Sequence, residues 1–323
     1  MSRIVAITGA TGFAGRHAVA ELEAKGYRLR AIVRQPDRAG LPASVDMVKG
    51  DLSDPQALQA LLNGADAVVH LAGALTGLSA QDYFSVNQQG TQALVAQALA
   101  LGTARFVHVS SLAAREPHLS LYAASKRAGE EAVRACMDDL NAIIIRPPAV
   151  YGPGDRGTLP LITELTRPIA AIPSSPGARF SLIHGRDLAR LIVLALDSDG
   201  RGLHEVSDGK PGGYGWADLA AVASAVRGSP VRPIYLPRLL PTAVAWGAEG
   251  IARLRGKPGM VNRGKIAELY HPDWVSRAGT LALSDPLPFE RGFTETVNWY
   301  RAAGWLPRGP SVDRSAQRSG KSS

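Results

Sequence analysis

Short apolar runs rich in β-branched residues alternate with helix-like segments through the first half of the chain. Between the first two runs, Val19, Leu22 and small alanines form one apolar stripe, and Gly26 ends the helical pattern. Because strands that alternate with helices pair in parallel, the pattern predicts an α/β fold with a doubly wound parallel sheet. The predicted strands are residues 4–8, 29–33, 45–48, 67–71, 106–109 and 142–145.

After Arg146 the alternation becomes irregular. Residues 180–196 predict a strand that runs into a helix, and residues 213–227 and 292–303 predict further helices. The expected organisation is a first domain, a smaller mixed lobe and a disordered tail rich in Ser, Gly and Arg. These three parts are expected at residues 1–150, 151–306 and 307–323.

Composition fits an ordinary globular protein of 323 residues, 46% hydrophobic and 20% charged. The single cysteine, Cys136, excludes an internal disulfide and a cysteine-based metal site, and we expect no metal. The N-terminus lacks the charged and apolar regions of a secretory signal, and no uncharged stretch is long enough to span a bilayer. The expected location is therefore the cytoplasm.

The net charge of +8 raises the question of an anionic partner. Four basic residues and one acid in 307–323 account for part of it. Nucleic acid is not expected as a partner, because basic residues are not interleaved with aromatics and no finger or helix-turn-helix spacing is present.

Three glycines in TGATGFAG follow the first predicted strand and open the first predicted helix. Glycine at such points permits a tight turn, close approach of the backbone to a pyrophosphate, and close helix–strand packing. The motif therefore predicts a dinucleotide site formed by Gly9, Thr11, Gly12, Phe13 and Gly15.

The end of the second predicted strand bears on the choice of cofactor. An acid there binds the ribose 2′-hydroxyl of NAD, whereas arginine accommodates the 2′-phosphate of NADP. The chain has Arg34 and Arg38, which favour NADP(H) over NAD(H), although Asp37 is an alternative ribose ligand. Asp51 and Leu52, after the third strand, are expected beside the adenine.

Tyr122 and Lys126 are four residues apart in the helix-like segment YAASKRAGEEAV, so both lie on one face. An adjacent ammonium is expected to stabilise the tyrosine phenolate and to lower the tyrosine pKa, giving an acid/base group. Ser111 follows a predicted strand at the usual ligand-binding edge of such a sheet, and could hydrogen-bond a substrate oxygen.

Together, TGATGFAG, HLAG, VNQQGT, VSS, YAASK and RPPAVYGPGD resemble the extended type of the short-chain dehydrogenase/reductase superfamily, over roughly residues 3–210. The resemblance implies a Rossmann-type domain and an Asn, Ser, Tyr, Lys set, by position Asn87, Ser111, Tyr122 and Lys126. A helix cap is the alternative role of Asn87. The resemblance also implies that Lys126 binds the nicotinamide ribose.

Further cofactor contacts are implied by the same resemblance. They involve the residues after the fourth strand and the loop after the sixth, where residues 147–150 cover the nicotinamide. By position these are Leu71, Ala72, Gly73, Pro147 and Val150.

The chain departs from the sugar-nucleotide members of the superfamily. Only ten residues separate Ser111 from Tyr122, and Leu112 and Ala113 stand where dehydratases carry an Asp-Glu pair. Reduction or oxidation of a carbonyl or alcohol needs a hydride donor, one proton donor and an oxyanion anchor, which are present. A sugar-nucleotide epimerase and a non-catalytic accessory subunit of a respiratory complex remain as alternatives.

Residues 234–254 predict an apolar helix that precedes a basic cluster between Arg253 and Lys265. Sterol dehydrogenases and lipid-directed reductases of the extended type have comparable segments, so a hydrophobic substrate of the sterol or oxo-ceramide type is expected. The segment could instead lie on an anionic membrane surface as a peripheral contact, or be an ordinary core helix. We also consider a homodimer.

Overall fold

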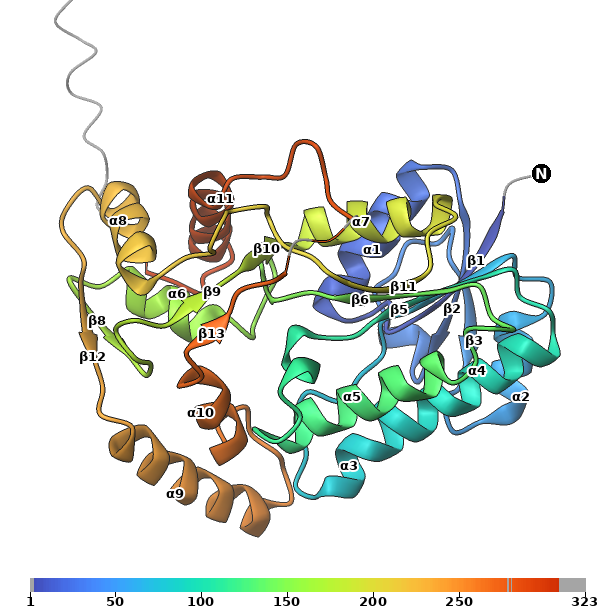
Figure 1. The fold of residues 1–323 in the computed structure, drawn as a ribbon, viewed down its shortest axis with the longest axis horizontal. Coiled ribbons are helices and arrows are strands. Elements are labelled where there is room, and N and C mark those ends of the chain that lie inside the picture. The colour runs from blue at the N-terminus through green and yellow to red at the C-terminus, as the bar shows by residue number, and fades with distance from the viewer. Residues whose placement is uncertain (1–2, 278, 280, 308–323) are drawn as a thin grey trace, which may run out of the picture.

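The computed structural model describes residues 3–277, 279 and 281–307, and its centre is a seven-stranded parallel sheet (Figure 1). The strand order is β11-β6-β5-β4-β1-β2-β3, which confirms the predicted doubly wound sheet. The predicted strands agree with the observed ones to within one residue at each end. These six are β1 (Ile4–Thr8), β2 (Arg28–Val33), β3 (Asp46–Lys49), β4 (Ala67–His70), β5 (Arg105–Val109) and β6 (Ala142–Arg146), and the seventh strand, β11 (Gly202–Glu205), was not predicted.

Helices cover both faces of this sheet (Figure 1). On one face α1 (Phe13–Ala24) packs beside α7 (Gly185–Asp197), against Val5 and Ile7. On the other face α2 (Pro55–Leu62), α4 (Thr91–Ala100) and α5 (Leu121–Arg134) cover Ala6 and its neighbours. Successive strand residues point to opposite faces, so nearly every position of the central strands is buried.

Side-chain caps define the starts of two of these helices. Asp54 accepts hydrogen bonds from the N–H groups of residues 56 and 57 at the start of α2, which selects Asp54 rather than Ser53 as the cap. Ser120 accepts a hydrogen bond from the N–H of Ala123 and is the N-terminal cap of α5, the helix that carries Tyr122. The N-terminal turn of α5 is thereby held at the carboxyl edge of the sheet.

The chain does not pass from the first domain to the second lobe only once, as the boundary expected after residue 150 implied. The chain leaves the sheet at β7 (Ala149–Tyr151), then returns with α7 and β11, and β11 pairs with β6. Residues 185–205 therefore lie with the first domain, in contrast to the expectation that residues 151–306 form one separate lobe. The basic tail expected at 307–323 lies outside the described residues from 308 onward.

The remaining elements form a smaller mixed lobe with its own apolar core around Phe289, Phe293 and Tyr300. Short parallel pairs, β7 with β10, β8 with β12 and β9 with β13, join the segments of the lobe. Its elements are α6 (Leu159–Leu165), β8 (Ile169–Ile172), β9 (Arg179–Phe180), β10 (Leu182–His184), α8 (Trp216–Arg227), β12 (Arg232–Tyr235), α9 (Leu239–Arg255), α10 (Arg263–Leu269), β13 (Asp273–Trp274) and α11 (Phe289–Ala302).

The apolar segment expected as one helix at residues 234–254 is divided: its first residues belong to β12, and α9 begins at Leu239. Figure 1 shows α9 at the periphery, with α10 between it and α5. Among the helices of the described residues, none combines the length and the hydropathy that a bilayer crossing requires.

Candidate active site

The glycine turn between β1 and α1 leaves no room for side chains. Gly9 has φ +74°, and a Cβ there would lie 2.5 Å from the backbone nitrogen of Ala72. A Cβ on Gly15 would lie 2.1 Å from the carbonyl oxygen of Gly9. Gly9 therefore packs directly on the chain after β4, and Gly15 packs on the turn itself, so both positions require glycine.

The start of α1 has the properties of an anion site. Gly12 is the N-terminal cap and supplies no side-chain acceptor, so the first N–H groups of the helix, beginning at Phe13, are not capped by a side chain. Such groups, together with the helix dipole, bind phosphate. Thr11 is exposed in the same turn. The geometry thus fits the pyrophosphate of a dinucleotide.

Cationic side chains surround a hollow at the end of β2. Arg34 and Arg38 line it together with Lys49 at the end of β3, and Asp37 is the one acid among its lining residues. Lys49 was not anticipated, because it becomes a neighbour of Arg34 only through the pairing of β2 with β3. The hollow has the charge that a 2′-phosphate would need.

Asp51 and Leu52 lie at the next strand end, as expected for residues beside an adenine. The Asp51 carboxylate accepts hydrogen bonds from the Ser53 hydroxyl and N–H, which lower the pKa of Asp51. Leu52 is buried against Gly90. Asp51 therefore stabilises the turn after β3, while Leu52 packs its side chain against Gly90 beneath that turn.

A chain of buried polar groups supports residues 71–73. Thr8 Oγ1 lies 2.6 Å from His70 Nδ1 and accepts a hydrogen bond from the Ala72 N–H. Burial lowers the pKa of His70 to about 3, so this imidazole is neutral. Leu71 and Ala72 are half-buried beside the glycine turn, and the Gly73 Cα faces the Lys126 side chain. The expected cofactor residues are thus brought to one edge of the sheet.

Asn87 is buried in a π-helical turn, Ser85–Gly90, rather than capping a helix. Its side-chain amide accepts from the Ala74 N–H at 2.7 Å and donates to the Ala74 carbonyl at 3.0 Å and to Ser125 Oγ at 2.8 Å. Both N–H groups of the Asn87 amide and its oxygen are therefore hydrogen-bonded within the protein. Asn87 therefore connects the loop after β4 to α5. It lies near Lys126, but its bonds are to Ala74 and Ser125.

Ser111 and Tyr122 meet at the carboxyl edge of the sheet. Ser111 follows β5 and caps the 3-10 helix Leu112–Arg115, and its hydroxyl lies near enough to Tyr122 to lower the pKa of that phenol. Burial raises the pKa of Tyr122 to about 12, the Ser111 hydroxyl lowers it in part, and the charge of Glu268 adds to the rise. Tyr122 is accordingly a neutral phenol near pH 7, the form that can donate a proton.

The Lys126 ammonium does not act on Tyr122 as the spacing suggested. Its Nζ donates to the Val109 carbonyl at 3.0 Å, and no lowering of the Tyr122 pKa arises from it. Burial lowers the pKa of Lys126 itself to about 8. In this arrangement the pKa of Tyr122 is raised rather than lowered, because burial outweighs the other contributions.

Pro147 and Val150 flank the same edge. The Pro147 carbonyl accepts from the Leu112 N–H at 2.8 Å, which fixes the end of β6 against the turn after Ser111. Val150 lies in β7 and packs partly against the sheet core. Pro147 thus contacts the segment after Ser111, and the covering role of both residues stays a prediction.

A pocket of about 330 Å³ adjoins Tyr122. Its lining is mixed. The apolar residues come from the loop after β4, the start of α5 and the loop between α9 and α10; they are Leu75, Leu78, Leu119, Leu121, Met260 and Val261. Polar and charged residues complete it, among them Glu249, Arg253, Asn262, Arg263 and Lys265. The buried Glu268 of α10 also lines it, and accepts hydrogen bonds from Ser120 Oγ and Lys265 Nζ. The Ser120–Glu268 contact spans 148 residues, so it was not visible in the sequence.

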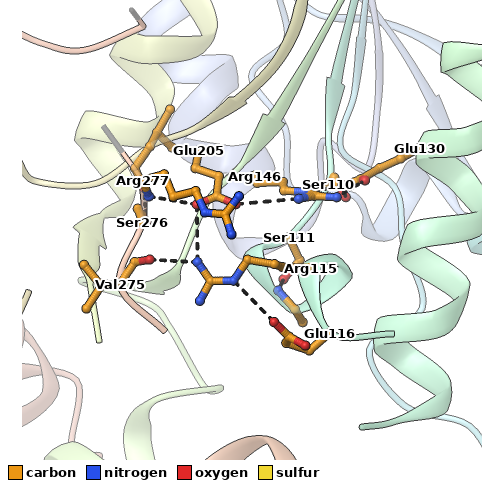
Figure 2. Close-up of polar contacts among 12 residues, drawn as sticks. Ser110, Ser111, Arg115, Glu116, Glu130, Arg146, Glu205, Val275, Ser276 and Arg277 are labelled. Carbon is orange, nitrogen blue, oxygen red and sulfur yellow. Dashed lines mark hydrogen bonds and ion pairs between the residues drawn. The ribbon is translucent and has the colours of Figure 1, made fainter. Parts of the chain in front are cut away.

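A buried ionic network lies behind Ser111 (Figure 2). Glu130 of α5 accepts from Ser110 Oγ at 2.6 Å and from the Arg146 guanidinium at 2.7 and 2.6 Å. Glu205 of β11 lies 3.6 Å from Arg146 Nη1 and 3.5 Å from Arg115 Nη1. The network therefore connects the ends of β5, β6 and β11 with the helix that carries Tyr122.

The chain was compared with known proteins. A sequence model of the NAD dependent epimerase/dehydratase family matches residues 5–206. "Ceramide reductase" of Caulobacter vibrioides is 43% identical over 311 residues, which cover 94% of this chain and 96% of that protein. "Sterol demethylase protein B" of Methylococcus capsulatus is 29% identical over 218 residues, 61% of this chain and 66% of that protein.

The fold also matches solved structures. DesIV, a dTDP-glucose 4,6-dehydratase from Streptomyces venezuelae with NAD and TYD bound, superposes with a TM-score of 0.67 at 24% identity, over 94% of this chain and 99% of DesIV. This likeness concerns the fold alone. With the matched family model and the glycine turn described above, it leads to one conclusion: the chain belongs to the NAD-dependent epimerase/dehydratase family, within the extended short-chain dehydrogenases/reductases, and is an NAD(P)-dependent enzyme.

Proposed function

We propose that the protein reduces the ketone of a hydrophobic, lipid-like substrate to an alcohol, with NADPH as hydride donor. The observation that carries the proposal is the proximity of Ser111 and the neutral Tyr122 beside a pocket that has apolar residues on part of its lining and charged residues on the rest. A substrate of the oxo-ceramide or sterol type is supported by the similarity to proteins named ceramide reductase and sterol demethylase.

In this proposal each residue has one task. Ser111 and Tyr122 hydrogen-bond the substrate oxygen, and Tyr122 gives it a proton as the carbonyl carbon is reduced. Lys126, held at the strand end by Val109, is positioned to bind the ribose next to Gly73. NADPH, when bound, supplies the hydride.

The preference for NADPH rests on charge at the far end of the cofactor site. Arg34, Arg38 and Lys49 line one hollow, and a 2′-phosphate would carry the negative charge that these groups can bind. The phosphate-binding turn and residues 71–73 would hold the pyrophosphate and the nicotinamide half in the order that the parallel sheet imposes.

The activity is tested with the purified protein, NADPH and a long-chain oxo-ceramide in detergent micelles. NADPH consumption should equal alcohol formation, and Tyr122→Phe should lower kcat roughly 100- to 10,000-fold, because the proton donor is lost. Tyr27→Phe, which changes a tyrosine bonded to Asp197 far from the site, is the matched control. Full turnover by Tyr122→Phe would refute the assignment, and turnover of a UDP-sugar without added nicotinamide would favour an epimerase.

A further inference from the structure

Helix α9 turns its apolar half outward. Leu239 is 82% exposed, Trp246 is 61% exposed and Leu254 is 89% exposed, and Ala245 is the helix's buried residue. In an α-helix with 3.6 residues per turn, the exposed apolar side chains fall on one half of the cylinder. The members of this face are Leu239, Leu240, Val244, Trp246, Ile251 and Leu254.

The opposite half of α9 faces the protein, and it is made of small or polar residues. Thr242, Ala245, Glu249 and Ala252 lie on this side and are less exposed than the apolar face. An ordinary surface helix buries its apolar stripe and exposes its polar side. Since α9 does the reverse, its outer face has the composition of a surface that is covered by an apolar partner.

The charges around this face have one sign. Between residues 238 and 265 the chain has six basic residues and one acid, Glu249. Glu249 is occupied by Arg263, which donates to it from its backbone N–H at 2.7 Å and from Nε at 3.0 Å. Lys265 likewise pairs with Glu268 at 3.1 Å. Arg255 and Lys257 follow the end of the helix and are exposed. The surface therefore combines exposed apolar side chains with a rim of net positive charge, to which Arg255 and Lys257 contribute.

We propose that α9 docks the protein on an anionic lipid bilayer. In this arrangement Leu239, Trp246 and Leu254 enter the acyl boundary, while Arg255 and Lys257 reach acidic headgroups. The charges favour a bilayer over a second copy of the chain, because pairing two such faces would bring positive rims together without an acid to oppose them. A single Trp ring, stacked by Arg263 at 4.3 Å, suits the boundary between apolar and polar layers.

The pocket beside Tyr122 lies against the protein-facing side of α9. Ala252 and Arg253 of α9 line that pocket, as do Met260 and Val261 of the loop that follows. In the proposed docking, a lipid leaving the bilayer at the end of α9 would enter the pocket past Met260 and Val261, which are exposed and also line it. This delivery step rests on the proposed function, whereas the docking itself does not.

Docking is tested by flotation of the full-length protein with vesicles, without NADPH or substrate. Vesicles of phosphatidylglycerol and phosphatidylcholine should bind it in about 0.02 M salt, and binding should fall more than roughly tenfold in about 0.5 M salt or with phosphatidylcholine alone. The double variant Leu239→Ser/Leu254→Ser and the double variant Arg255→Glu/Lys257→Glu should each weaken binding at least as much. Leu194→Ser, on α7 and likewise exposed, is the control that should bind normally.

A second measurement locates the helix within the bilayer. Brominated acyl chains should quench part of the tryptophan fluorescence, and Trp246→Phe should remove that quenching. Absence of binding to anionic vesicles at low salt, or equal binding by the α9 variants and wild type, would overturn the proposal. So would a dimer of wild type that Leu254→Ser dissolves, since the face would then join two copies.

The same variants separate docking from catalysis. Leu239→Ser/Leu254→Ser should reduce a water-soluble short-chain ketone at the wild-type rate, yet lose activity on oxo-ceramide embedded in vesicles by the same factor as it loses binding. If no ketone is reduced by wild type, the proposed function fails while the flotation result still stands. If ketones are reduced but vesicles are not bound, docking alone fails.

Discussion

Glu130 and Arg146 form a buried ion pair through two hydrogen bonds, 2.7 Å from Nε to Oε1 and 2.6 Å from Nη2 to Oε2 (Figure 2). The Glu130 side chain is fully buried, and the side chain of Arg146 is 8% exposed. A buried charge is tolerated only with a partner. The pair thus fixes α5 against the end of β6, one residue before Pro147.

Replacing Glu130 with Gln should destabilise the fold severely. Arg146 would keep its charge but lose the opposing carboxylate: Gln retains one acceptor oxygen and places an NH2 donor where the other oxygen stood, with Glu205 at 3.6 Å as the remaining acid. Loss of one partner of a buried pair costs about 3–5 kcal/mol in the free energy of unfolding, measured by urea titration. The neighbouring Glu131→Gln breaks an exposed pair with Arg127 and should cost less than about 1 kcal/mol. Equal losses for the two variants would contradict the structural role of the buried pair.

The fold of the first domain followed from the sequence because each of its strands is an apolar run with local periodicity. β11 was not predicted, since its sequence, GLHE, has no such pattern, and it becomes a strand by pairing with β6. The domain boundary was misplaced for the same reason. Local periodicity therefore identified elements, but not the sheet to which an irregular segment returns.

The residues of the candidate site likewise fall into those that local sequence motifs reveal and those that only the folded chain brings together. Gly9, Gly15, Ser111 and Tyr122 could be identified from local motifs, which place Gly9 and Ser111 after strands and Gly15 and Tyr122 near the starts of helices. Glu205 contacts Arg115 and Glu268 contacts Ser120, over separations of 90 and 148 residues, so no local sequence pattern could predict these contacts. The periodicity of α9 likewise indicated an apolar helix, but could not say which half of the helix the protein covers.

Lys126 should make stability rise with pH above neutrality. Burial lowers its pKa to about 8 in the folded protein from the ordinary value of 10.5, so between these values the unfolded chain holds a proton that the folded chain has lost. The free energy of unfolding should therefore increase from about pH 8 to about pH 9.5, relative to Lys126→Met. Tyrosines oppose this trend only above their own ordinary pKa near 10.

Urea titrations of both proteins at these two pH values measure the effect. Lys25→Met, at the exposed end of α1, is the control and should keep the wild-type dependence. A parallel pH dependence of wild type and Lys126→Met would show that the ammonium is not buried in this way.

Removing Glu268 should move the alkaline limit of the reductase. The Glu268 carboxylate raises the pKa of Tyr122 by its negative charge, so Glu268→Gln should lower that pKa. Because reduction needs the neutral phenol, the alkaline fall in kcat should begin at lower pH in the variant. Glu249→Gln changes another acid of the same pocket that is not among the groups acting on Tyr122, and should leave the profile in place. If the alkaline fall in kcat of Glu268→Gln occurred at the same pH as in wild type, this electrostatic coupling would be excluded.

Gly15→Ala should abolish cofactor binding and weaken the fold. Its Cβ would lie 2.1 Å from the Gly9 carbonyl oxygen and 2.8 Å from the Ala10 Cα, both backbone atoms that cannot move aside independently. The turn would have to open, and the first N–H groups of α1 would leave their position. Cofactor binding is measured by titration calorimetry and stability by thermal unfolding. Gly177→Ala, where a Cβ meets nothing within 4 Å, should behave as wild type; a functional Gly15→Ala would refute the close approach.

The choice between NADPH and NADH should depend on the hollow at the end of β2. Arg34→Ala and Lys49→Ala remove cations that line it, so each should raise the KM for NADPH by roughly tenfold, corresponding to about 1–2 kcal/mol for a charge-assisted hydrogen bond to phosphate. The KM for NADH should change less than about twofold, because NADH has no 2′-phosphate. Arg28→Ala, at the opposite end of β2, is the matched control and should leave both values unchanged. Equal effects of Arg34→Ala on NADPH and NADH would mean that the arginine serves the ribose or the surface, and the preference would then have to be assigned to Asp37 and NAD.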